Sequence, residues 1–287
     1  MDPLHRIGIV GTGRAGSVVG AALRAAGHQL TGVTARSDAS RDRAARLLPG
    51  VPVVDLPALV AGAEIVVLAV PDDAIATVGP RVGASAGQYV VHLSGALGLA
   101  VLDGSGGTPV ALHPPMTFTG AELDVRRLAE VTFTATAPDT ARALVEELVE
   151  GIGAGVQWVA EEDRAAYHAG VVHGANYLVT LVEQASEVLR SAGIGDPVAI
   201  LRPLMTALLD NALRDGPAAL TGPISRGDVA TVRAHLEVLP AGVRPSYVVL
   251  ARATTEIAER AGRLDVDTAD RLRLVLEPQD CDRRSER

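Results

Sequence analysis

The chain has 287 residues, 48% of them hydrophobic and 21% charged, which is enough to build the packed cores of one large or two ordinary domains. Its net charge of −8 and its aromatic content of 2% argue against a nucleic-acid or anionic-membrane surface. All 26 basic residues are arginines, so a Schiff-base lysine and a P-loop lysine are both excluded.

Cysteine usage and hydrophobic runs indicate the compartment. Cys281 is the single cysteine, which excludes an intrachain disulfide and a cysteine-based zinc site, and we expect no metal. A strand pattern begins within a few residues of the N-terminus, and no apolar run reaches the ~18 residues of a membrane span. We therefore expect a cytoplasmic protein without a signal peptide or a membrane partner.

Strand and helix patterns alternate over the first 160 residues. The clearest strand, residues 64–70, is apolar on both faces, as a central parallel strand is. Further strands are expected at 6–10, 29–35, 51–54, 88–93, 109–113, 131–136 and 155–159, with helices between most of them. This alternation predicts an α/β fold with a doubly wound, parallel Rossmann sheet.

The pattern after Ala160 is helical, with one long helix from 161 to about 192 and further helices at about 197–214, 228–239, 246–262 and 267–276. Residues 169–181 are small or apolar on nearly every face, which is typical of a buried helix. We therefore predict a dinucleotide-binding domain at 1–160, an all-helical substrate and dimerisation domain at 161–277 that forms a homodimer, and a disordered tail at 278–287.

A glycine-rich turn lies directly between the first strand and the first helix. Gly11, Gly13 and Gly16 form G-x-G-x-x-G, in the context that identifies a dinucleotide-binding turn. The glycines permit the tight turn, the approach of the pyrophosphate and the close packing of helix on strand. The phosphates would bind at the helix N-terminus, so the expected contacts are Gly11, Thr12, Gly13, Arg14, Ala15 and Gly16.

The end of the second strand predicts which dinucleotide binds. NAD-binding turns carry an acid there, whereas this chain has Arg36 and Ser37. Arg36 suits a 2′-phosphate, and Arg41 would add a second charge, so the sequence predicts NADP.

The ends of the next strands supply the other expected cofactor contacts. Val70 and Pro71 border the nucleotide crevice, where Asp72 and Asp73 are expected to cap the following helix. Ser94 would bond the carboxamide or the substrate, or else cap a helix.

Five segments resemble a known family. They are GTGRAGS (11–17), HLSGALG (92–98), LHPPMTF (112–118), YHAGVVHGANYLVTL (167–181) and ALTGPISRGD (219–228) with His235 downstream. The chain thereby resembles short-subunit, Rossmann-like NADP oxidoreductases with a helical C-terminal domain of once-unknown function. Some relatives are assigned as an alternative type of ketopantoate reductase, in a superfamily with pyrroline-carboxylate reductase and 6-phosphogluconate dehydrogenase. The resemblance implies an active site between the domains and dimers through the helical domains.

The chain departs from this superfamily at its proton donor. Several relatives use a Lys and an Asn one turn apart on the first long helix of the second domain. Asn176 is available here, but the position one turn earlier is Val172. His168, with i, i+4, i+8 spacing to Val172 and Asn176, shares their face and can change charge near neutral pH. We expect His168 to donate the proton and Asn176 to orient the carbonyl, although either could instead be a buried structural residue.

The other candidate site residues lie near turns. His113, fixed by the two prolines that follow it, and Ser94 are alternative proton donors. Asn211, Thr221 and Arg226 are candidate substrate contacts, Arg226 for a carboxylate. The leading hypothesis is an NADPH-dependent reductase of a small oxo-acid resembling ketopantoate. The alternatives are a reductase of a cyclic imine and a non-catalytic NADP-binding or scaffold protein.

Overall fold

The computed structural model describes residues 4–277. The chain forms two compact units, Met1–Gly174 and Ala175–Arg287. The division lies beyond the predicted boundary at residue 160, because helix α7 (Arg164–Val171) makes hydrogen bonds to the first unit through Arg164 and Tyr167. The predicted disordered tail, 278–287, lies outside the described residues.

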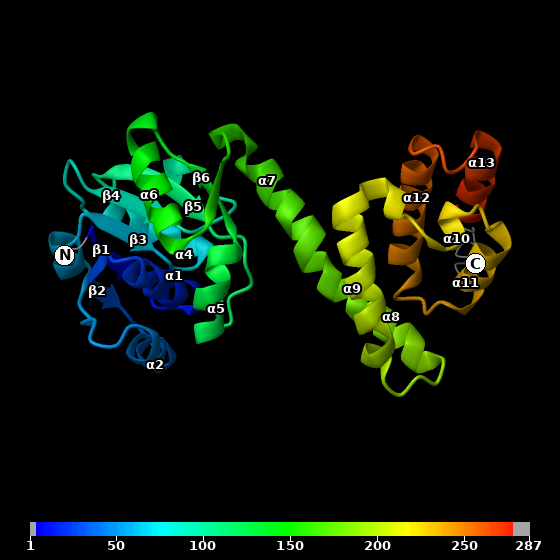
Figure 1. Cartoon of the computed structure of the whole chain (residues 1–287), viewed down its shortest axis with the longest axis horizontal. Helices are drawn as coiled ribbons and strands as arrows, with labels where there is room; N and C mark the ends of the chain where they lie inside the picture. Colours follow the sequence, from blue (N-terminus) through cyan, green and yellow to red (C-terminus); the bar gives the residue numbers. More distant parts are fainter. Residues whose placement is uncertain (1–3, 278–287) are drawn as a thin grey trace, which may run out of the picture. The chain divides into compact units, whose positions relative to one another are not determined.

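The first unit is built on a seven-stranded sheet (Figure 1). Its strands are β1 (Arg6–Val10), β2 (Gln29–Thr34), β3 (Ile65–Leu68), β4 (Tyr89–His92), β5 (Thr108–His113), β6 (Thr132–Thr136) and β7 (Gly155–Trp158). They follow the order β2-β1-β3-β4-β5-β6-β7. All neighbours are parallel except β5 and β6, which pair antiparallel.

Helices cover both faces of this sheet, as the predicted doubly wound fold requires. They are α1 (Arg14–Ala25), α2 (Asp38–Leu47), α3 (Leu56–Gly62), α4 (Asp72–Val78), α5 (Glu122–Arg127) and α6 (Arg142–Ile152). On β3, Ile65 and Val67 join the apolar cluster formed with α1 and α6. Val66 and Leu68 join the cluster formed with α3 and α4. Successive residues of a central strand therefore enter opposite cores.

The predicted strand at 51–54 is wrong. This segment contributes only an isolated bridge between Val53 and Val33. Pro52 has no N–H, so although its carbonyl accepts from Val33 at 2.9 Å, the ladder cannot extend through it.

The long helix predicted from 161 is divided. A 3-10 turn (Glu161–Asp163) precedes α7, and a π-helical segment (Val172–Asn176) follows it and leads into α8 (Tyr177–Ser191). The division between the two units falls inside the π-helical segment. Such segments are rare and often occur at functional sites.

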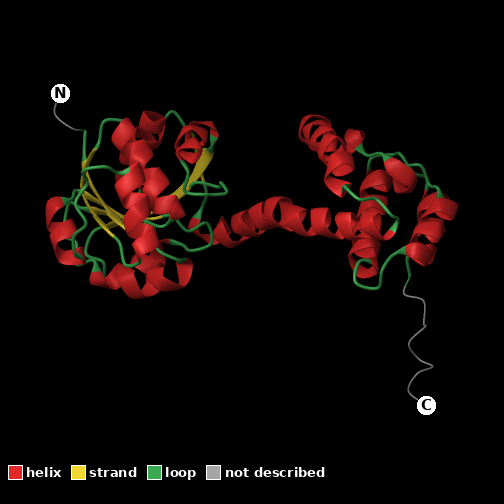
Figure 2. Ribbon diagram, turned by 90° about the horizontal axis from the view of Figure 1, so that it is seen from below, coloured by secondary structure: helices red, strands yellow, loops and turns green. Residues whose placement is uncertain are grey.

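The second unit contains helices only among its described residues (Figure 2). After α8 come α9 (Pro197–Asp215), α10 (Gly222–Ser225), α11 (Val229–Val238), α12 (Arg244–Arg260) and α13 (Val266–Val275), with a 3-10 turn at Gly216–Ala219. Their common core is apolar and consists of Ile224, Val232, Ala251, Ala258, Leu264, Leu272 and Leu276. In the described part of the chain, no helix is long and apolar enough to cross a membrane.

The apolar segment expected to be buried is exposed within a single chain. On α8, Tyr177 is 55% exposed and Val179 is 68% exposed. On α9, Leu204 and Leu213 are 53% and 79% exposed. The core of this unit lies among α10–α13, so α8 and α9 keep an apolar face that the other helices of this unit leave uncovered.

We predict that Gly16→Ala destabilises the first unit. A Cβ at Gly16 would lie 2.1 Å from the carbonyl oxygen of Gly11 and 2.7 Å from Ala69 Cβ, so the backbone must move, at a cost of about 1–3 kcal/mol. Gly20→Ala, on the same helix, is the control, because its Cβ would meet three apolar side chains at 3.4 to 3.5 Å. Urea unfolding followed by the fluorescence of Trp158, on β7, measures the difference; equal effects would contradict the prediction.

Candidate functional site

The glycine turn between β1 and α1 has the geometry of a phosphate cradle. Gly11 has a φ of +96°, and a Cβ there would lie 2.8 Å from the carbonyl oxygen of Ala69. Gly13 is different, since its Cβ would have the Ala69 oxygen, at 3.9 Å, as its one neighbour within 4 Å. The turn therefore leaves open space above Gly13, where the predicted pyrophosphate would approach.

The amides around this space are oriented for an anion. The first turn of α1 leaves the N–H groups of Arg14, Ala15 and Gly16 without partners inside the helix. Thr12 is fully buried, and its N–H and hydroxyl donate to carbonyls of Thr34 and Ser40. Thr12 thus holds the turn against β2 and α2. These residues fit the diphosphate of a dinucleotide, which would bind to the free amides.

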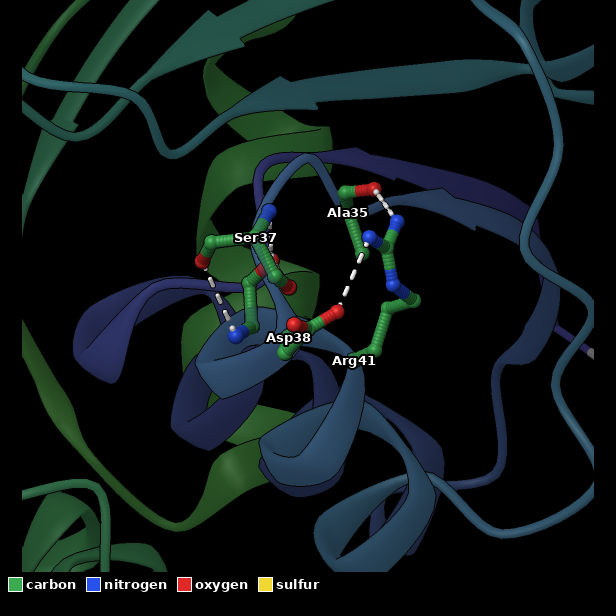
Figure 3. Close-up of polar contacts among 5 residues, drawn as sticks. Ala35, Ser37, Asp38 and Arg41 are labelled. Carbon is green, nitrogen blue, oxygen red and sulfur yellow. Dashed lines mark hydrogen bonds and ion pairs between the residues drawn. The ribbon is translucent and has the colours of Figure 1, made fainter.

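The loop after β2 is held by hydrogen bonds to residues of α2 (Figure 3). Ser37 is the N-cap of α2, and its hydroxyl accepts from Ser40 N. Arg41 donates to the Ala35 carbonyl at 3.2 Å and to the Asp38 carboxylate at 3.1 Å. The guanidinium of Arg41 is thus engaged within the loop, and its predicted role as a second phosphate-binding charge has no support in this geometry.

A cavity of about 320 Å³ borders the same loop. Arg36 lines it on one side, and Arg81, at the end of the 3-10 turn Gly79–Arg81, lines it too. The other lining residues are Val10, Thr34, Ala35, Val54, Asp55, Leu56 and Val78. The volume and the apolar walls are typical of a small-molecule pocket. Val70 and Pro71 lie at the end of β3, where Val70 Cγ1 would be 3.1 Å from a Cβ on Gly11.

Ser94 organises the turn after β4. Its hydroxyl donates to Asp72 Oδ2 at 2.6 Å and accepts from the amides of Ala96 and Leu97. One donor and two acceptor positions are the full capacity of a hydroxyl. Ser94 therefore positions the turn and has no free bond for a carboxamide or a substrate. Asp72, expected to cap α4, lies in its first turn, and the N-cap is Pro71.

His92 is held as a neutral imidazole beneath this turn. Its Nδ1 accepts from Ser94 N at 3.2 Å, which leaves Nε2 to donate to the Gly98 carbonyl at 3.1 Å. Burial lowers the pKa of His92 to about 4. A proton on Nδ1 would break the bond from Ser94 N, so the turn requires the uncharged ring.

Three side chains, His113, Tyr167 and His168, form a histidine–tyrosine cluster. His113 Nδ1 lies 2.7 Å from the Tyr167 hydroxyl. The rings of His113 and His168 meet edge to face, with centroids 6.3 Å apart. Gly95 packs against both, since a Cβ there would lie 2.8 Å from His168 and 2.9 Å from His113. Burial, and then the charge of His168, lower the pKa of His113 to about 4.

Arg164 joins α7 to the turn after β4. Its side chain is 1% exposed. The guanidinium donates to the carbonyls of Ser94, Gly95 and Leu97 and to the Thr136 hydroxyl. One turn earlier, Glu161 accepts from Leu99 N at 2.7 Å. Arg164 and Glu161 thereby hold the turn that carries Ser94 and Gly95 against α7, which carries Tyr167 and His168.

The candidate residues of the second unit are not brought together. In the described chain no hydrogen bond joins any two of Asn176, Asn211, Thr221 and Arg226. Asn176 is exposed at the start of α8, and Asn211 accepts from Arg214 at 2.7 Å. Thr221 is the N-cap of α10 without a side-chain capping bond, and Arg226 is exposed at its C-terminal end. Their roles toward a substrate stay predictions.

The sequence reasoning missed Tyr167, Arg164 and His92 and misjudged Asp72. Tyr167 is 54 residues from its partner His113, and no periodicity reports such a contact. The sequence did place two of them beside predicted site residues, since Tyr167 precedes His168 and His92 is two residues before Ser94. Nothing in the sequence distinguishes a buried Arg164 from an exposed one.

We predict that acid destabilises the first unit through His92 and His113. Unfolded histidine titrates near 6.5, whereas both folded pKa values are about 4. Between these values the unfolded chain binds protons that the folded chain excludes. The free energy of unfolding should therefore fall as the pH falls through this window, by up to about 1.4 kcal/mol per pH unit for each histidine.

Urea unfolding at several pH values, followed by Trp158 fluorescence, measures this slope. His113→Asn should flatten it, whereas His235→Asn, on α11 of the second unit, is the control. An unchanged slope in His113→Asn would show that His113 does not contribute.

Two family models match the chain. Residues 2–114 match a Rossmann-like domain, and residues 131–254 match a domain of unknown function, DUF2520. The second match begins within the first unit, at the residue before β6, and continues into the helical unit. The turn and sheet described above therefore lie in the Rossmann-like match, and Tyr167, His168 and Arg164 lie in the DUF2520 match.

Solved structures show the same fold. A Bacteroides fragilis protein, described as an NADP oxidoreductase by inference, has 22% identity and a TM-score of 0.75, covering 88% of this chain and 98% of that one. A Thermotoga maritima protein has 24% identity and a TM-score of 0.70, covering 89% and 99%. The 1-pyrroline-5-carboxylate reductase of Streptococcus pyogenes has 15% identity and a TM-score of 0.62, covering 91% and 99%.

No curated protein matches the chain. The two domain models together match both the glycine turn and the histidine–tyrosine cluster. The chain thus matches a Rossmann-like domain followed by a DUF2520 domain.

Proposed function

We propose that this protein is an NADPH-dependent reductase of a small oxo-acid. The observation that carries the proposal is the placement of two features in one unit. The glycine turn, with its open space above Gly13, follows β1, and the histidine–tyrosine cluster draws His113 from the end of β5. Ligands of parallel α/β sheets bind beyond the carboxyl ends of the strands. Bound NADPH would supply a hydride, and the chain must then supply a proton.

His168 is the proposed proton donor. Two imidazoles this close share their protons unequally, because a charge on one disfavours a charge on the other. Burial lowers the pKa of His113 to about 4, so His113 stays neutral at physiological pH. His168 is the other imidazole of the cluster, with its ring centroid 6.3 Å from that of His113, and it is the group that we propose as the donor. Tyr167 holds His113 through their 2.7 Å hydrogen bond and is a positioning residue.

The substrate is proposed as an oxo-acid, with ketopantoate the first to test. Asn176 would orient its carbonyl, while Asn211, Thr221 and Arg226 would contact its other groups, Arg226 through a carboxylate. A cyclic imine is the second candidate, favoured by the shared fold with a pyrroline-carboxylate reductase. Both candidates need the same hydride and the same proton donor, so the choice depends on the substrate-binding residues.

A homodimer through the helical unit and a cytoplasmic location complete the proposal. The exposed apolar side chains of α8 and α9 support the dimer, because monomeric proteins rarely expose large contiguous apolar surfaces. They flank a groove of about 440 Å³, lined mainly by apolar residues of α8, α9, α11 and α12. A second copy would cover this surface.

The test of the reaction is NADPH consumption with a panel of 2-oxo acids and cyclic imines. We expect turnover with an oxo-acid and a loss of ~10²–10⁴-fold in kcat for His168→Ala, the usual effect of removing a general acid. NADPH affinity should stay nearly unchanged in this variant. His5→Asn, a histidine before β1, is the control and should keep the parental kcat.

Two outcomes would count against this reading. NADPH binding without consumption across the whole panel would favour the non-catalytic NADP-binding protein. A His168→Ala enzyme with parental kcat and an unchanged pH profile would remove His168 from the mechanism and leave the proton to water or to another group.

The dimer is tested by light scattering coupled to size exclusion. We expect about twice the chain mass of 29.6 kDa. Leu204→Glu should shift the protein toward the monomer, because it places a charge on an exposed apolar position that lines the groove. Leu123→Glu, an exposed leucine on α5 of the first unit, is the control. A parental protein of single-chain mass at micromolar concentration would refute the dimer.

A further inference from the structure

Two arginines border the cavity of about 320 Å³ in the first unit. Arg36 follows β2, and Arg81 ends the 3-10 turn after α4, so they approach from different elements. In residues 4–277 neither guanidinium has a hydrogen bond or an ion pair to the chain. A pair of cations without protein partners at one cavity is a site for an anionic group.

The other charged residues nearby, Arg41 and Asp55, do not engage Arg36 or Arg81. Arg41 is occupied by Ala35 and Asp38, so it does not add to the cavity (Figure 3). Asp55 also lines the cavity, but its carboxylate accepts from Ala58 N at 2.9 Å as the N-cap of α3. Asp55 makes no ion pair with either arginine, so both remain available to a ligand.

The walls of the cavity specify what would carry the anion. Val10, Val54, Leu56 and Val78 provide apolar surface that suits a flat purine ring. The cavity lies at the ends of β1 and β2, where Val10 and Thr34 line it, and the glycine turn directly follows β1. An adenosine with a phosphate on its ribose matches apolar walls beside two cations.

We propose that Arg81, together with Arg36, binds the 2′-phosphate of NADP and that Arg81 is a determinant of its preference over NAD. This inference rests on the proposed NADP cofactor. Arg36 and Arg81 bind the phosphate from two sides, and the loop that presents Arg36 is held by Arg41. The preference thus depends on Arg81, which lies 45 residues after Arg36 in the sequence.

The experiment measures equilibrium affinities for NADPH, NADH, 2′,5′-ADP and ADP by calorimetry. Arg81→Ala should weaken NADPH and 2′,5′-ADP by roughly tenfold, the lower range for a charge-assisted hydrogen bond. Affinities for NADH and ADP should stay within about twofold of the parent, since these ligands lack the 2′-phosphate. Arg81→Lys should retain part of the preference, because it keeps the charge but loses the planar fork.

The control is Arg127→Ala, an exposed arginine on α5 that does not line the cavity. Unchanged NADPH affinity in Arg81→Ala, with a parent that prefers NADPH, would overturn this inference alone. Equal losses for NADPH and NADH would also overturn it, because Arg81 would then contact a part common to both. A parent that binds neither dinucleotide would overturn the inference together with the proposed function.

Discussion

The guanidinium of Arg164 is the interaction on which the candidate site depends. It lies almost entirely out of contact with solvent and binds three carbonyls of the turn after β4 and a hydroxyl of β6. Burying a cation costs free energy unless its donors are satisfied. Each of these acceptors must therefore stay within hydrogen-bonding distance of Arg164. Because Arg164 begins α7, the same contacts determine where Tyr167 and His168 lie relative to His113 and Gly95. The sheet supplies one half of the cluster and a helix supplies the other.

The region also contains two neutral imidazoles, those of His92 and His113. His92 keeps the turn closed through a fixed tautomer, and His113 stays uncharged between Tyr167 and His168. Burial lowers the pKa of both histidines to about 4. The chain has no lysine, so a lysine proton donor is excluded at this cluster.

The sequence predicted what local patterns encode. The glycine turn, the parallel strands and most helices follow from residue spacing. The antiparallel pairing of β6 could not be seen, because a strand's direction leaves no mark in its composition. Pro52 was a visible signal against a strand at 51–54. Long-range contacts were out of reach: Arg164 and Tyr167 find partners 54 to 70 residues away. The π-helical segment also breaks the regular spacing that placed Asn176 on the face of His168.

Arg36 and Arg81, at the cavity of about 320 Å³, also bear on how a dinucleotide would reach the protein. The chain as a whole is negative, with a net charge of −8, so at long range it repels a polyanionic ligand. Local cations reverse the sign of the field only within about a Debye length, near 8 Å at physiological ionic strength. The net negative charge of the chain would therefore slow association at long range, and the two arginines would attract the ligand at short range. Added salt weakens both effects, so the ionic-strength dependence of the association rate reports their balance.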